Sequence, residues 1–67
     1  MDGDKLKAKI KACHLSVKDV SDELGIDQST YYRKVAASGE NFSVAQVKRL
    51  AELLHLTSEE AQEIFLQ

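Results

Sequence analysis

The chain has 67 residues, which limits it to one domain with one small apolar core. It contains a single cysteine, which excludes an intramolecular disulfide and a zinc site made only of cysteines. The first residues, MDGDKLKAK, lack the apolar run of a secretory signal, and no apolar stretch is long enough to cross a bilayer. We therefore expect a cytoplasmic protein that does not associate with membranes.

The charge is unevenly distributed along the chain, although the net charge is only −2. All nine basic residues lie between Lys5 and Arg49. Residues 1–49 together contain seven acidic residues, so this part of the chain has a net charge of +2. The last eighteen residues carry four glutamates and no basic residue. A mildly basic body with an acidic end is compatible with nucleic-acid binding. It also predicts weak non-specific affinity for DNA, because few cations are available to neutralise phosphates.

The local patterns predict an all-helical chain, since there is no proline, there are only three glycines, and no useful strand alternation occurs. Leu6, Ile10 and Cys13 recur at helical spacing and predict a first helix over 4–13. Four later segments share one signature, in which an apolar residue precedes a capping residue and a second apolar residue follows four positions after the cap. The apolar pairs are Leu15 with Val20, Ile26 with Tyr31, Phe42 with Val47, and Leu56 with Ala61.

The caps within these signatures, Ser16, Asp27, Ser43 and Thr57, set the beginnings of the later helices. Ser43 with Gln46 and Thr57 with Glu60 also have the spacing of a capping box. The predicted helices cover 17–24, 28–37, 44–54 and 58–66. The expected inward residues of the last two are Val47, Leu50, Ala51, Leu54, Ala61, Ile64 and Phe65.

The second and third helices are separated only by a turn at Gly25, the residue best suited to a left-handed helix end. This is the pattern of a helix-turn-helix, which commonly inserts its second helix into the major groove of DNA. We therefore expect one compact, all-α, five-helix domain over 1–67, in which helices two and three form a helix-turn-helix.

The apolar pairs also determine which side of the third helix faces outward. If Tyr31 points inward with Val35, the opposite side centres on Ser29, Arg33 and Ala36. The predicted exposed surface then presents side chains that can read base edges. These candidate DNA-binding residues are Gln28, Ser29, Thr30, Tyr32 and Arg33.

The segment VKDVSDELGIDQSTYYRKV resembles the Cro/repressor-type (XRE-like) helix-turn-helix family of phages and bacteria. Val20, Leu24, Gly25, Ile26 and Tyr31 occupy the apolar and turn positions of that family. The resemblance covers nearly the whole chain, because a fourth and a fifth helix also belong to that domain. It implies a repressor-like five-helix fold and base contacts from the positions of Gln28, Ser29 and Arg33, with Thr30 and Tyr32 beside them.

The chain departs from the family pattern at three places, of which Val17 and Glu40 bear on DNA binding and Ser21 bears on helix packing, for which it is still small enough. Val17 replaces a glutamine that often binds phosphate, Ser21 replaces a small residue that is often alanine, and Glu40 lies in a loop that is often basic. Phosphate contacts are instead expected from Lys34, from Lys18 and from the amides at the helix beginning near Ser43.

Each candidate contact has an ordinary structural alternative. Arg33 would then be a solvated arginine paired with Glu40, and Gln28 and Ser29 would be first-turn polar residues of the kind common at helix starts. We expect the four lysines of the first helix either to be exposed to solvent or to lie close enough to contact DNA.

The predicted function is a sequence-specific, double-stranded-DNA-binding transcriptional regulator, such as a phage or prophage repressor that acts sterically as a homodimer. The acidic C-terminal helix, with Phe65 and Leu66, is the expected dimer surface, unless these two residues simply close the core. The alternative is a protein-binding adaptor or anti-repressor that keeps this fold.

The chain holds no acid pair, nucleophile–base set or phosphate-binding glycine loop, so we expect no enzyme activity, no cofactor, no metal and no small-molecule ligand.

Overall fold

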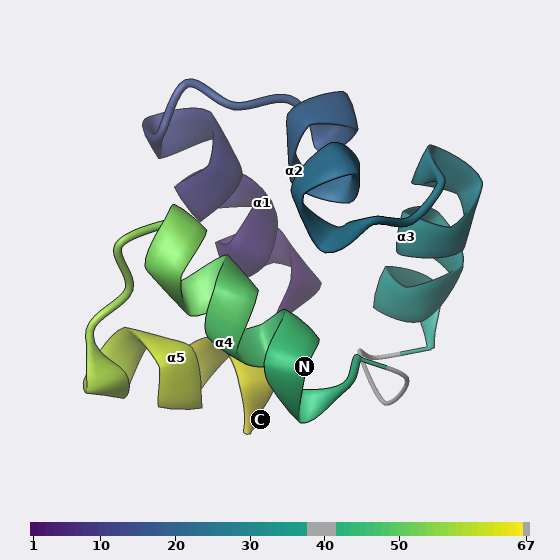
Figure 1. Cartoon of the computed structure of the whole chain (residues 1–67). Coiled ribbons are helices and arrows are strands. Elements are labelled where there is room, and N and C mark those ends of the chain that lie inside the picture. The colour runs from purple at the N-terminus through teal and green to yellow at the C-terminus, as the bar shows by residue number, and fades with distance from the viewer. Residues whose placement is uncertain (38–41, 67) are drawn as a thin grey trace.

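The computed structural model describes residues 1–37 and 42–66, and this part of the chain folds into helices without strands (Figure 1). Each helix predicted from the sequence is present. The bounds are α1 Gly3–Ala12, α2 Val17–Leu24, α3 Gln28–Ala36, α4 Val44–Leu53 and α5 Ser58–Phe65.

The predicted ends of four helices are wrong by one residue. α1 begins at Gly3 because Asp2, and not a later residue, caps it by accepting a hydrogen bond from the backbone N–H of Lys5 at 3.0 Å. The other errors have one cause, since the last residue predicted as helical is the cap that follows the helix. These C-caps are Cys13, Ala37, Leu54 and Leu66.

The beginnings of α2, α4 and α5 are held by capping boxes, in which a hydroxyl and the side chain three residues later each bond the other's backbone N–H. The boxes predicted at Ser43 and Thr57 are confirmed. A third box joins Ser16 to Asp19, which fills the position usually taken by glutamate or glutamine. Asp27 occupies the cap position of α3, but its side chain makes no capping hydrogen bond.

Three of the helix connections have the same construction. Residues with left-handed backbone end α1, α2 and α4: His14 at φ 58°, Gly25 at φ 69° and His55 at φ 53°. The backbone N–H of the next residue donates to the carbonyl five residues back, as in a Schellman motif. These bonds are Leu15 to Ile10 at 3.1 Å, Ile26 to Ser21 at 3.0 Å and Leu56 to Ala51 at 2.9 Å. The same Leu or Ile is the apolar residue before the next helix cap, so one short link both ends a helix and begins another.

The core lies between the helices and includes residues from each of them. α2 packs on α3 and α4, while α1 packs on α5, and the backbone N–H of Asp2 donates to the carbonyl of Ile64 at 2.7 Å. This bond ties the first residues of the chain to the end of α5. The buried apolar side chains are Leu6, Ile10, Val20, Tyr31, Phe42, Leu50, Leu54 and Ile64.

Several residues expected inside are only partly buried. Cys13 is half-buried, and its thiol donates to the carbonyl of Leu54 at 3.6 Å. Val47, Ala51, Ala61 and Phe65 are also half-buried. The helices are short, and a domain of this size has too little interior to cover a wide apolar stripe.

Among residues 1–37 and 42–66, one polar side chain is fully buried. Ser21 on α2 is 1 % exposed, and its hydroxyl has no hydrogen-bond partner in the part of the chain that the structure describes. A small side chain allows close approach here, but the hydroxyl adds an unsatisfied polar atom to the core.

Among the described helices, none combines the length and apolar character that crossing a membrane requires.

Candidate nucleic-acid interface

The orientation of α3 is set by Tyr31, which is 4 % exposed and belongs to the core. Its ring lies 6.2 Å from that of Phe42 and makes an edge contact at 5.8 Å with Tyr32. Burial raises the pKa of Tyr31 to about 12, because the phenolate is poorly solvated there. The inward direction predicted for Tyr31 is confirmed, and Ser29, Arg33 and Ala36 on the opposite side are exposed.

The exposed side of α3 carries a row of polar side chains over two helical turns. Gln28 and Ser29 are exposed in the first turn, Thr30 is half-buried beside them, and Tyr32 is 58 % exposed. Arg33 donates from Nη2 to Oγ1 of Thr30 at 3.1 Å. This bond uses one of the five guanidinium donors, which leaves four for another partner.

Arg33 makes no ion pair with residues 1–37 or 42–66. Its expected alternative partner, Glu40, lies outside the described residues, as do the other loop residues 38–41.

Lys34 lies on the flank of α3 next to Phe42, which precedes α4. Its Nζ is 5.8 Å from the centroid of the Phe42 ring, within the range of a cation–π contact. The side chain is half-buried, so the ammonium lies at the junction of α3 with the segment that begins α4.

Lys18 and Ser43, the two candidate phosphate contacts outside α3, already have partners within the chain. Lys18 forms an ion pair with Asp22 at 3.0 Å, and this hydrogen bond raises the pKa of the lysine. The hydroxyl of Ser43 accepts from the N–H of Gln46, whose side chain accepts from the N–H of Ser43, both at 3.0 Å. An anion at this end would therefore meet the amides of Val44 and Ala45, which have no acceptor within the helix.

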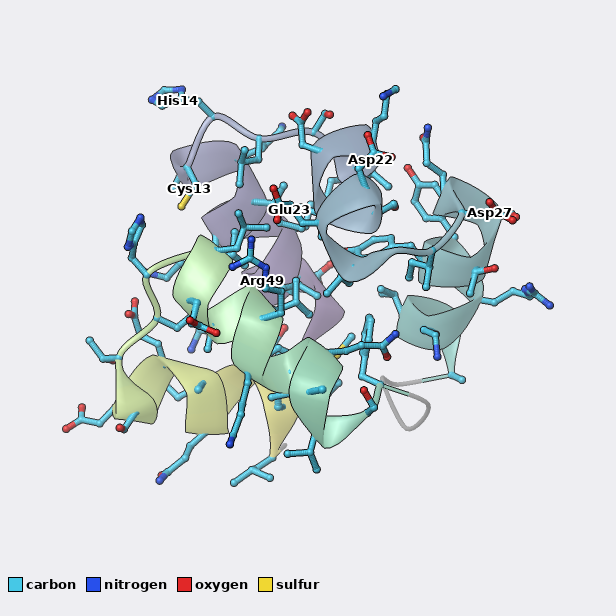
Figure 2. The ribbon with its side chains drawn as sticks, viewed as in Figure 1. Cys13, His14, Asp22, Glu23, Asp27 and Arg49 are labelled. Carbon is cyan, nitrogen blue, oxygen red and sulfur yellow. The ribbon has the colours of Figure 1, made fainter. Side chains whose placement is uncertain are left out.

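Ion pairs neutralise part of the basic surface. Lys5 pairs with Glu63 at 2.5 Å, and Lys9 pairs with Glu60, so that α1 and α5 are joined by two bridges. Arg49 on α4 pairs with Glu23 on α2, and Figure 2 shows these two side chains pointing toward one another. Within residues 1–37 and 42–66, the cations without an ion pair include Lys7, Lys11, Arg33 and Lys48.

The links between α1 and α5 were not predicted from the sequence. The signal was present, because Lys5 and Lys9 are one turn apart, as are Glu60 and Glu63. The packing of the two helices was needed to bring the two sets together. The acidic C-terminal end is thus partly neutralised by α1.

A groove of about 460 Å³ lies between α1, the beginning of α2 and α3. Its floor includes Ile10 and Tyr31, and Tyr32 also lines it. Two unpaired lysines of α1, Lys7 and Lys11, complete the side that faces α3.

These features define a small all-α domain with a helix-turn-helix unit formed by α2, the turn at Gly25 and α3 (Figure 1). Comparisons of the chain with known protein families, with characterised proteins and with solved structures find no match.

Proposed function

We propose that this protein is a sequence-specific transcriptional regulator that binds double-stranded DNA through α3. The observation that carries the proposal is the two-sided character of this helix. Tyr31 locks one side into the core, and the opposite side presents Gln28, Ser29 and Arg33 to solvent. A rigid helix with amide, hydroxyl and guanidinium groups on its free side suits insertion into the major groove.

The proposed readout uses side-chain geometry and involves no chemistry. Arg33 donates two bonds to the O6 and N7 atoms of guanine, while Gln28 pairs with adenine and Ser29 bonds to either base. Thr30 orients Arg33 through the 3.1 Å bond between them. Lys34, Lys18 and the amides near Ser43 are proposed phosphate contacts that position the helix but do not select the sequence.

A homodimer is proposed because one copy makes few DNA contacts. Two copies on half-sites one helical turn apart would double the contacts and bind a palindromic operator. The proposed dimer surface is the end of α5, where Leu66 is 77 % exposed and Phe65 packs partly against the core. The proposed regulator is of the phage or prophage type and acts in the cytoplasm. On its operator, it would block or recruit polymerase by steric means, without performing chemistry.

The test is selection from a pool of randomised duplexes, followed by binding measurements on the selected sequence. We expect Arg33→Ala to weaken binding by about 5- to 150-fold for each bound copy, the equivalent of one bidentate base contact of about 1–3 kcal/mol per half-site. Lys48→Ala is the matched control, because it removes from α4 an exposed cation that forms no ion pair with residues 1–37 or 42–66. Equal losses in the two variants would contradict a specific role for Arg33.

A second candidate is a protein-binding adaptor or anti-repressor with the same fold. It is favoured by the ion pairs of Lys5, Lys9, Lys18 and Arg49, which remove positive charge from the surface. This candidate predicts that no sequence emerges from the duplex pool and that random duplex is not retarded even at low salt.

A further inference from the structure

The four lysines of α1 fall into two pairs with different surroundings. Lys5 and Lys9 face α5 and form ion pairs with Glu63 and Glu60. Lys7 and Lys11 line the groove toward α3 and form no ion pair within the described residues. Both unpaired lysines are exposed, and they lie one helical turn apart on the same face.

Two like charges one turn apart repel each other and weaken a helix slightly. The acid that shares the groove is Asp4, in the first turn of α1, where a carboxylate interacts favourably with the helix dipole. Asp4 forms no ion pair with either lysine. The groove edge therefore keeps a net positive charge beside an apolar floor.

The same groove joins this edge to the proposed DNA-reading helix. Tyr32, which neighbours Arg33 on the exposed side of α3, lines the groove across from α1. Val17 at the beginning of α2 also lines it, and its apolar side chain cannot bond to a phosphate. The positive charge available on this flank of α3 thus comes from α1.

We propose that Lys7 and Lys11 bind the DNA phosphate backbone along this flank of α3, with the Tyr32 hydroxyl as a further donor. This inference rests on the proposed function, because it extends the DNA contact of α3 onto α1. Lysine and tyrosine are common partners of phosphate oxygens, and such contacts fix the position of a recognition helix without reading sequence.

The test compares two double variants that remove the same charge from the same helix. Lys7→Gln with Lys11→Gln removes the groove pair, and Lys5→Gln with Lys9→Gln removes the pair that faces α5. Each double variant includes one lysine from the last turn of α1, so their effects on the helix dipole are matched. Binding of the full chain to a fluorescein-labelled, mixed-sequence 30-base-pair duplex is measured by anisotropy over a range of salt concentrations. Circular dichroism checks that both variants are folded.

The groove variant is expected to reduce the slope of log K against log salt by about 0.9 for each lost phosphate contact, or about 1.8 per bound copy. If the proteins bind equally at 1 M salt, this change weakens binding by about 60-fold at 0.1 M salt. The control variant is expected to keep the wild-type slope.

Equal slopes for the two variants, or a wild-type slope for the groove variant, would overturn the assignment of Lys7 and Lys11 while leaving DNA binding by α3 intact. Absence of binding by the wild-type chain would instead overturn the proposed function, and this inference with it.

Discussion

Two histidines occupy backbone positions that favour glycine, and this gives a quantitative prediction for stability. His14 and His55 have φ values of 58° and 53°, close to the 69° of Gly25 in the equivalent link. An L-residue in this region is disfavoured by about 1–2 kcal/mol, because its Cβ approaches the next carbonyl oxygen. We expect His14→Gly and His55→Gly to stabilise the fold.

The size of the gain follows from two opposing terms. Glycine removes the steric term, but it increases the chain entropy lost on folding by about 0.4–1 kcal/mol. The net stabilisation is about 0.5–1 kcal/mol for each substitution, and a change of 1 kcal/mol shifts Tm by about 4–8 °C in a domain of this size. Gly25→Ala should destabilise by a similar amount, and only through its backbone, because no atom lies within 4 Å of an added Cβ.

The assay is urea unfolding followed by circular dichroism, with His14→Ala and His55→Ala as controls that remove the imidazole but keep Cβ. The midpoint should rise for the glycine variants without a change in slope, and it should not rise for the alanine variants. The double glycine variant is included because the two links are near each other, as the bond from Cys13 to the carbonyl of Leu54 shows. Equal stability of the glycine and alanine variants would refute the backbone explanation.

Two further predictions concern the core and the helix caps. Ser21→Ala should stabilise the fold by about 1–2 kcal/mol in the same urea assay, because it removes a buried unsatisfied hydroxyl and improves helix propensity. Destabilisation of the fold would mean that the hydroxyl has a hydrogen-bond partner in solution. The N–H of Ser16 lowers the pKa of Asp19, and the hydrogen bond from Lys9 lowers that of Glu60. Since both carboxyls hold protons more weakly in the folded state, stability should fall as the pH drops below about 4. Asp19→Asn with Glu60→Gln should flatten this dependence, whereas an unchanged dependence would assign it to other acids.

Much of the secondary structure could be predicted because its causes are local. Ser43 and Thr57 bond to groups three residues away, so a short stretch of sequence contains the whole capping box. The phase of α3 followed from the spacing of Ile26 and Tyr31, which turned Arg33 outward in agreement with the structure. His14 and His55 were missed as left-handed residues, although each precedes the apolar residue before a cap, as Gly25 does.

The charge pattern of the surface depended on contacts between segments distant in the sequence. Nothing local distinguishes Lys5 and Lys9 from Lys7 and Lys11, since all four lie in one ten-residue helix. The docking of α5 on one side of α1 neutralises the first pair, whereas the second pair lies along the groove toward α3 and forms no ion pair within the described residues. The sequence by itself therefore determined where the helices begin and which side of α3 faces out, because hydrogen bonds and apolar spacing within a few residues decide both. Only the tertiary structure decided which cations remain available to a partner, because an ion pair between two helices depends on how those helices pack.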